Sequence, residues 1–392
     1  MHELSMDLTA VLRHAVAAGA SDVHFKVGQP PVLRSDGELA ASTEFPALGD
    51  ADLQAVLDRV TVAVPRRREL FDETGDLDLA YSEPGLPRFR VNGFRQRGAI
   101  SFAFRVIPDQ IPSFGELHLP PGVARLAEEQ RGLVLVTGAT GSGKTTTLAA
   151  MLDHINRTRR RHIVTIEDPI EVLHPDRECI VSQREVGLDT ESFEQALRRV
   201  LRQDPDVILI GELRDSETAH VALQAAESGH LVFSTLHTLD AAETISRMVE
   251  FFAPEKQPQV ISIMAGVLRG VISQRLLPEL GGGRVPAVEV MVTNARIAEL
   301  IRERRTDEIP DAIADGDFFQ MQTFSEALIE LVLDGRVDRE TAANAASNRH
   351  DFEIALGHAE KSANFAVARE AEPEIVERPK DDGLPALRVA GA

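Results

Sequence analysis

Residues 132–145 read Gly-Leu-Val-Leu-Val-Thr-Gly-Ala-Thr-Gly-Ser-Gly-Lys-Thr. The first six residues form a mostly apolar run of strand length, and the last eight match the pattern G-x-x-x-x-G-K-[ST]. The residues that follow, from Thr146 to Met151, are typical of a helix. A buried strand, a glycine-rich loop and a helix in this order are the context in which the pattern holds a phosphate chain. The sequence therefore predicts a phosphate-binding loop at residues 138–145.

The glycines of this loop let the backbone pass close to a phosphate chain. Consecutive N–H groups then point inward, and the following helix adds the positive end of its dipole. We expect Lys144 to reach the terminal phosphates and the Thr145 hydroxyl to bind Mg²⁺. The predicted ligand is a nucleoside triphosphate with Mg²⁺. The predicted nucleotide-binding residues are Gly138, Ala139, Thr140, Gly141, Ser142, Gly143, Lys144, Thr145 and Thr146.

Strand-like and helix-like segments alternate after residue 122, which predicts an α/β domain with a parallel sheet and right-handed crossovers. The expected strands are Leu133–Thr137, His162–Glu167, Val207–Ile210, Leu231–Ser234 and Val285–Met291. The expected helices are Lys144–Arg157, Ser192–Arg202, Asp215–Ser228 and Ala241–Glu250, with a further run of helices to about residue 359.

The first 107 residues have a different pattern. Two amphipathic helices, Met6–Ala18 and Asp50–Val60, accompany short strand-like segments, which predicts a small α+β domain. The segment 108–121 holds four prolines and is expected to be a linker. We expect residues 122–360 to form the second domain with helices at its C-terminal end. The tail 361–392, with mixed charges and little periodicity, is expected to be mostly disordered.

The composition excludes several classes of protein. An apolar content of 43% over 392 residues fits a globular protein of two or three domains. A net charge of −20, no tryptophan and one tyrosine argue against nucleic-acid binding, which needs a basic face and stacking aromatics. A single cysteine, Cys179, excludes an intramolecular disulfide and a multi-cysteine zinc module. Without a long apolar run or a basic leader, we expect a cytoplasmic protein.

Acidic residues end two of the expected strands. Val207-Ile-Leu-Ile-Gly-Glu212 ends in Glu212, a candidate to polarise the attacking water or to bind Mg²⁺ through water. The other strand ends in Glu167-Asp-Pro-Ile-Glu171, whose acids are candidates to face Mg²⁺ because open α/β sheets bind ligands at their carboxyl edge. The alternatives are a solvated glutamate and a solvated acidic turn.

Histidines and arginines supply the remaining candidates. His230 and His237 flank one apolar strand, so they either serve the nucleotide site or have a structural role. Arg90 and Arg105 lie on the two strands that close the first domain, with Arg97 between them. These arginines are either exposed or, if the first domain leans over a nucleotide, bidentate donors to its phosphates.

Together these motifs resemble the secretion-superfamily ATPases, and specifically the PilT-like retraction ATPases of type IV pilus systems. The resemblance covers about residues 18–353. The matching segments include Gly19-Ala-Ser-Asp-Val-His24, Phe89-Arg-Val-Asn92, Thr165-Ile-Glu-Asp-Pro-Ile-Glu171, Gln183-Arg-Glu-Val186, Asp204-Pro-Asp-Val-Ile-Leu-Ile-Gly-Glu212 and Gly229-His-Leu-Val-Phe-Ser-Thr-Leu-His-Thr238. The resemblance implies a PAS-like first domain, a RecA-like P-loop ATPase domain and a homo-hexameric ring.

The resemblance also assigns roles to individual residues, with ATP and Mg²⁺ as cofactors. An Asp box falls on Glu167, Asp168 and Glu171, a Walker B acid on Glu212, and a His box on His230 and His237. The implied catalytic residues are Glu212, Glu171, Arg90, Arg105, His230 and His237, with Arg97 as a further candidate. The implied Mg²⁺ ligands, partly through water, are Thr145, Glu212 and Asp168.

The implied function is ATP-driven removal of pilin subunits from the filament base. The expected partners are an inner-membrane platform protein and, optionally, a paralogous ATPase, at the inner face of the cytoplasmic membrane. One motif departs from the family: Arg296-Ile-Ala-Glu-Leu-Ile-Arg-Glu303 stands for A-I-R-N-L-I-R-E, with Ala298 in place of the central arginine. An accessory, PilU-like retraction ATPase is therefore an alternative. An assembly or secretion ATPase is another, against which the absence of a four-cysteine cluster counts.

Overall fold

The N-terminal domain is built around an antiparallel sheet. In the computed structural model, which describes residues 6–35, 37–107 and 110–370, this sheet has the order β3-β2-β1-β6-β5-β4. The strands are β1 Asp22–Lys26, β2 Val32–Ser35, β3 Glu38–Ala41, β4 Asp76–Tyr81, β5 Phe89–Gln96 and β6 Ala99–Val106. The helices are α1 Leu8–Ala17, α2 Asp50–Thr61 and α3 Pro65–Thr74. Phenylalanine rings fill its core: Phe25, Phe71, Phe89, Phe102 and Phe104.

The C-terminal domain is built around a mixed sheet, called here the large sheet, with the order β13-β12-β7-β11-β10-β8-β9. Its strands are β7 Gly132–Thr137, β8 His162–Glu167, β9 Ile180–Glu185, β10 Val207–Ile210, β11 Leu231–Leu236, β12 Leu268–Pro278 and β13 Arg284–Val292. Neighbouring strands are parallel except β12 and β13. The carboxyl ends of β7, β8, β10 and β11 therefore share one edge.

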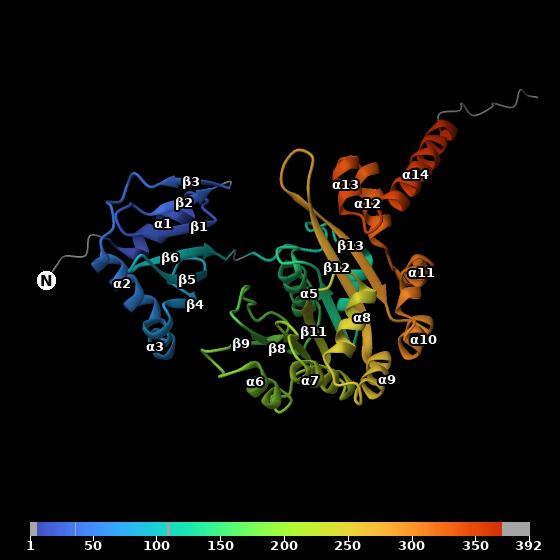
Figure 1. Ribbon diagram of the computed structural model, residues 1–392, viewed down its shortest axis with the longest axis horizontal. Helices are drawn as coiled ribbons and strands as arrows, with labels where there is room; N and C mark the ends of the chain where they lie inside the picture. Colours follow the sequence, from blue (N-terminus) through green and yellow to red (C-terminus); the bar gives the residue numbers. More distant parts are fainter. Residues whose placement is uncertain (1–5, 36, 108–109, 371–392) are drawn as a thin grey trace, which may run out of the picture.

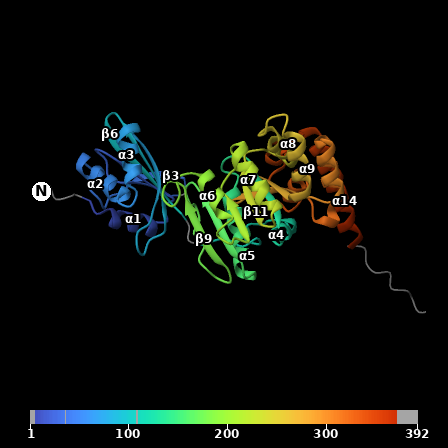
Figure 2. The same cartoon turned by 90° about the horizontal axis from the view of Figure 1, so that it is seen from below.

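Helices cover the large sheet and extend the chain beyond it. They are α4 Pro121–Ala127, α5 Lys144–Thr158, α6 Phe193–Val200, α7 Ser216–Glu227, α8 Ala241–Glu250, α9 Gln257–Val267, α10 Ala295–Glu303, α11 Ile309–Ala314, α12 Phe324–Leu333, α13 Arg339–Ala345 and α14 Arg349–Glu370, with 3₁₀ turns at Thr306–Glu308 and Asp317–Phe319. Helix α5 packs against β7, and α7 against β7 and β11. The N-terminal domain and α14 lie at opposite ends of the molecule (Figures 1 and 2).

The predicted α/β class is confirmed, but the sequence pattern misses two strands of the large sheet. The edge strand β9 reads Ile-Val-Ser-Gln-Arg-Glu, so polar residues hide its period. Strand β12 replaces part of the expected run of helices. Its interior carries Ser273 and Gln274, which are buried because they make polar contacts beneath the phosphate loop. The expectation of a parallel sheet is corrected at one edge, where β12 and β13 are antiparallel.

Helix α14 continues to Glu370, ten residues into the segment 361–392 that the sequence predicts to be disordered. Three alanines between Lys361 and Glu370 favour this continuation. The remainder of that predicted tail, residues 371–392, lies outside the described residues. Within the described ranges, no helix is both long and apolar enough to cross a membrane.

Candidate active site

The phosphate loop runs from the end of β7 into the first turn of α5. Gly143 precedes the helix with a φ of 91°, a left-handed conformation that glycine adopts without strain. Gly138 packs so closely that a Cβ atom there would lie 2.4 Å from the Gln274 carbonyl oxygen. The Gln274 side-chain amide also donates a hydrogen bond to the carbonyl oxygen of Ser142 at 2.9 Å. Strand β12 therefore supports the loop and defines its path.

Lys144 folds back over the loop. Its ammonium group donates hydrogen bonds to the carbonyl oxygens of Gly138 at 2.8 Å and Ala139 at 3.0 Å. Partial burial lowers the pKa of Lys144, and the carboxylates of Glu212 and Glu171 oppose that shift. The lysine and the two acids, which come from three separate segments, therefore share one electrostatic environment.

The loop offers groups that suit a phosphate chain with its cation. The side chains of Thr145 and Thr146 are exposed in the first turn of α5, and the Ser142 hydroxyl is buried without a hydrogen-bond partner. Within the described residues, no three His, Cys, Asp or Glu side chains are arranged to hold a metal by themselves. Mg²⁺ typically takes few protein ligands and completes its shell with phosphate oxygens and water. The exposed Thr145 hydroxyl is therefore available to a Mg²⁺ shared with a nucleotide.

Glu212 follows β10 at the carboxyl edge. One carboxylate oxygen lies 3.2 Å from Nε2 of His237, and the other forms an ion pair with Arg214. The Thr235 hydroxyl holds the preceding backbone by donating to the carbonyl oxygen of Gly211 at 2.8 Å. The Glu212 side chain is 19% exposed, so water can reach a carboxylate whose direction is fixed on both sides. Such a group can accept a proton from an attacking water molecule.

Glu167 points into the protein rather than towards the loop. Its carboxylate accepts hydrogen bonds from the Thr165 hydroxyl at 2.6 Å and from the Gln183 side-chain amide at 3.2 Å. Burial raises the pKa of Glu167, and those two hydrogen bonds oppose the rise. Asp168 and Glu171, by contrast, keep partly exposed carboxylates. Asp168 and Glu171 of the acidic turn are therefore accessible to the site. The buried hydrogen bonds of Glu167 hold the turn in place.

Arginines of the N-terminal domain reach this part of the large sheet. Arg90 lies between Asp78 of its own domain, at 2.9 Å, and Glu171 of the acidic turn, at 3.3 Å. The most buried contact joins Arg88 to Glu185 on β9 at 2.5 Å, with side chains only 12% and 6% exposed. The two domains are therefore joined by charge pairs directly beside the candidate site.

The other two candidate arginines stay in their own domain. Arg105 is 70% exposed and pairs with Asp22 at 2.9 Å. It lies directly opposite Arg90 in the sheet, one strand further from the large sheet, and neighbouring strands are about 5 Å apart. Arg97 occupies the exposed turn between β5 and β6, where its φ is 50°. The structure thus brings Arg90, but neither Arg105 nor Arg97, to the acidic turn.

The two candidate histidines lie at opposite ends of β11. His237 follows the strand and contacts Glu212. His230 precedes it, with its ring Nδ1 2.9 Å from the carbonyl oxygen of Ala225. Its own carbonyl oxygen accepts a hydrogen bond from Gly132 N, at the start of β7. A strand of six residues is about 20 Å long, so the structure brings His237, and not His230, to Glu212.

Sequence reasoning did not single out Arg88, Arg67 or Glu185. Arg67 donates to the carbonyl oxygen of Val186 at 3.1 Å and so adds to the contact between the domains. A signal for Arg88 was available, because strand alternation puts residues two apart on one face, and Arg90 was already a candidate. Glu185 lies in the segment Gln183-Arg-Glu-Val186, to which the family resemblance assigned no role. Pairing it with Arg88 required the tertiary structure.

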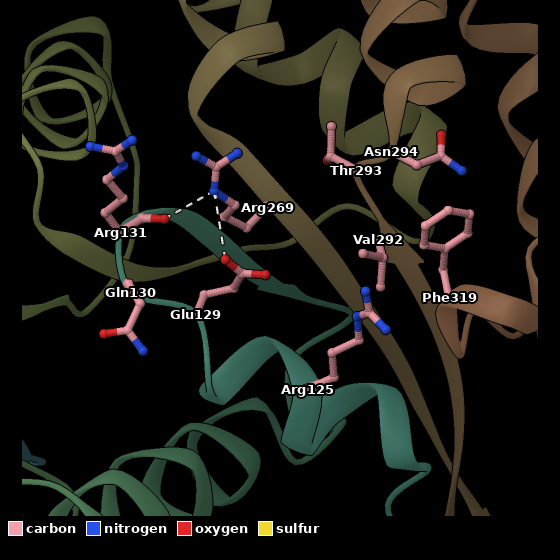
Figure 3. Close-up of a pocket in the computed structure, with 9 residues that line it drawn as sticks. All are labelled: Arg125, Glu129, Gln130, Arg131, Arg269, Val292, Thr293, Asn294 and Phe319. Atoms are coloured by element: carbon pink, nitrogen blue, oxygen red, sulfur yellow. Dashed lines mark hydrogen bonds and ion pairs between the residues drawn. The ribbon is translucent and has the colours of Figure 1, made fainter.

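A cavity of about 290 Å³ lies at the other, amino edge of the large sheet (Figure 3). Arg125, Arg131 and Arg269 line it together with Glu129 and Phe319. The Arg269 guanidinium donates to the Arg131 carbonyl oxygen at 3.0 Å, and Arg125 lies over the Phe319 ring. The length of β7 separates this cavity from the phosphate loop, so it is not the nucleotide site.

Comparisons with known proteins agree with this geometry. Residues 120–316 match the family model of the type II/IV secretion system protein. The chain is 44% identical to the type IV pilus retraction ATPase PilT of Pseudomonas aeruginosa, over 88% of this chain and all of that protein. It is 38% identical to the type IV pilus ATPase PilU of the same organism, over 90% and 91%. A crystal structure of the pilus retraction motor PilT with bound ADP superposes with a TM-score of 0.82 at 44% identity, covering 89% and 99%.

Proposed function

The chain belongs to the type II/IV secretion system protein family, and from that membership we propose that this ATPase is the motor of type IV pilus retraction. The observation that supports this proposal most strongly is the match to a pilus retraction ATPase along that protein's full length. The positions of the residues proposed for hydrolysis also support it, because Lys144 on the loop interacts electrostatically with Glu212, which lies beside His237. ATP turnover would thereby drive removal of pilin subunits from the filament base.

In the proposed reaction, Lys144 and the loop amides bind the phosphates. Thr145, with Asp168 acting through water, would hold a Mg²⁺ ion, which would supply positive charge against the phosphates. Glu212 orients and deprotonates the attacking water, because its carboxylate is held between Arg214 and His237. Because His237 contacts Glu212, its position would depend on whether the terminal phosphate is present.

We also propose a homo-hexameric ring in which the nucleotide lies between the two domains. Arg90 and Arg88 support the placement of the nucleotide between the domains, since both extend from the N-terminal domain to acids beside the site. Binding and release of the nucleotide would shift Glu171 against Arg90 and move one domain relative to the other. The ring would act on an inner-membrane platform protein, peripherally at the inner face of the cytoplasmic membrane, without a nucleic-acid partner.

A second candidate is an accessory retraction ATPase that works beside a paralogue. The observation in its favour is Ala298, which replaces the family arginine and is buried within α10. Arg296 on the same helix is exposed and pairs with Asp315 at 2.8 Å. Compared with the family motif, the arginine at position 298 is therefore absent from α10 and one is present at position 296. This change would alter contacts that α10 makes through its charged side chains.

The test is deletion of the gene in its native cell, with pilus number and twitching motility scored. Excess pili without twitching would support a retraction motor, and bald cells would contradict it in favour of assembly. Persistent twitching that depends on a paralogous ATPase would support the accessory role. Complementation with Lys144→Ala should fail completely, because the loop loses the cation that reaches the phosphates. Normal twitching with that variant would contradict an ATP-driven role.

A further inference from the structure

The segment that carries His237 is held by hydrogen bonds at the start of α8. The Thr238 and Thr244 hydroxyls lie 2.6 Å apart, and Asp240 caps the helix by accepting from Glu243 N at 2.8 Å. The first N–H groups of a helix have no partner within the helix. One of them, Ala241 N, donates instead to the carboxylate of Glu289 at 2.9 Å.

Glu289 is a polar exception in an apolar strand. It lies in β13 between Val288 and Val290, and its residue is only 7% exposed. Burial raises the pKa of Glu289 to about 7, while the N–H of Ala241 and the hydroxyl of Ser273 oppose the rise. An apolar side chain would fill this position at a lower desolvation cost. The advantage of a carboxyl group at this position therefore lies in the hydrogen bonds that it makes.

Those partners connect Glu289 to both halves of the site. Ser273 lies directly opposite it on β12 and accepts a hydrogen bond from the Thr137 hydroxyl at 3.0 Å. Thr137 is the last residue before the phosphate loop. Arg275 acts on Glu289 only at a distance, because its guanidinium stacks on Phe324 at 4.0 Å. A buried polar chain therefore runs from the phosphate loop to the helix that follows His237.

We propose that Glu289 is a positioning residue for ATP hydrolysis, whose carboxyl group holds the start of α8 so that His237 stays against Glu212. This inference rests on the proposed role of His237 beside Glu212. The carboxyl group itself does not reach the nucleotide. Its contribution is to stop the segment 237–240 from moving away from the phosphate loop, to which Ser273 and Thr137 connect it.

The test is a double-mutant cycle on the full-length protein, with kcat and KM for ATP measured in the presence of Mg²⁺. Glu289→Ala should lower kcat about tenfold and change KM less than about threefold, because misplacing a group near the reacting atoms slows turnover. Glu289→Gln keeps an acceptor for the Ala241 N–H, so it should restore kcat to within about twofold of the unmodified protein. In a His237→Ala background, Glu289→Ala should cost less than about twofold, since the two residues act through one contact.

Equal losses from Glu289→Ala in both backgrounds, or a change confined to KM, would overturn the inference. Normal turnover in the single variant His237→Ala would instead contradict the proposed role of that histidine, so the two failures differ. The matched control is Asp153→Ala, which removes another buried carboxylate, one paired with Arg157 and Arg177, and should leave kcat within about twofold. If Glu289→Ala does not fold, Glu289→Met, which fills the space without an acceptor, replaces it in the same cycle.

Discussion

The two edges of the large sheet are both rich in charged side chains, yet they differ in what those side chains can do. At the carboxyl edge, Lys144, Glu212 and His237 lie around a glycine loop and the first turn of α5. At the amino edge, Arg131 and Arg269 border the cavity of Figure 3, and the carbonyl oxygen of Arg131 is an acceptor for Arg269. The direction of the parallel strands separates these edges. Charged residues alone therefore do not make a nucleotide site; converging backbone N–H groups are needed as well.

Replacing an acid at each edge gives the strongest test of this difference. Glu212→Gln should lower kcat for ATP hydrolysis by about 100-fold or more, because the amide cannot accept the proton of the attacking water. Nucleotide binding should persist, since Lys144 and the loop are unchanged. Glu129→Gln, beside Arg269 at the amino edge, should leave kcat within about twofold. Steady-state turnover and equilibrium binding of a fluorescent ATP analogue measure both effects, and equal losses at the two edges would contradict the comparison.

The two histidines sharpen the comparison, because they lie on one strand. His237→Ala should lower kcat about tenfold, since Glu212 loses one of the two groups that direct it. His230→Ala should lower kcat less than about threefold, because its ring forms hydrogen bonds with the Ala225 carbonyl oxygen and the Ser228 hydroxyl, both before β11. The measurement is turnover per folded protein, with the melting temperature of each variant as control. A larger loss for His230→Ala would move the functional histidine to the amino edge.

The buried acid beneath the carboxyl edge should affect a different quantity, the stability of the fold. Burial raises the pKa of Glu289 to about 7, compared with 4.5 for an unburied glutamate. The folded protein then holds a proton that the unfolded chain releases, so this group's stabilising contribution is complete below pH 4.5 and is lost as the pH rises through 7. Glu289→Gln lacks this dependence. Its unfolding free energy relative to the unmodified protein should rise by roughly 2 to 3 kcal/mol between pH 5 and pH 8.

Denaturant unfolding of both proteins at each pH measures this difference. Glu129→Gln serves as the control, because Glu129 lies on the surface of the amino edge and should give a pH-independent difference of less than about 0.5 kcal/mol. A Glu289→Gln difference that stays flat with pH would mean that the carboxyl group is not buried in a costly environment.

The local sequence pattern was sufficient to predict the strands that are buried apolar runs. It was also sufficient to predict the helices whose apolar residues recur with a helical period. Strands β7, β10 and β11 are buried throughout, and the sequence predicts them within a few residues. Strand β9 could not be predicted in this way because its polar residues hide the strand period. Strand β12 could not, because its buried polar residues are paired with neighbours distant in sequence. Ser273, for example, bonds to Thr137, and Gln274 to Ser142, across more than 130 positions. These pairings exist only once the strands lie side by side.

The sequence by itself determined the phosphate loop, its lysine and the acid at the end of β10, because each depends on a short run of residues and on the strand beside it. Only the tertiary structure decided which candidates meet: His237 but not His230, and Arg90 but not Arg105. It also revealed the pair of Arg88 with Glu185, and Glu289 beneath the site. The physical reason is that strand order and direction set the distance between side chains, and both depend on long-range pairing that no local pattern encodes.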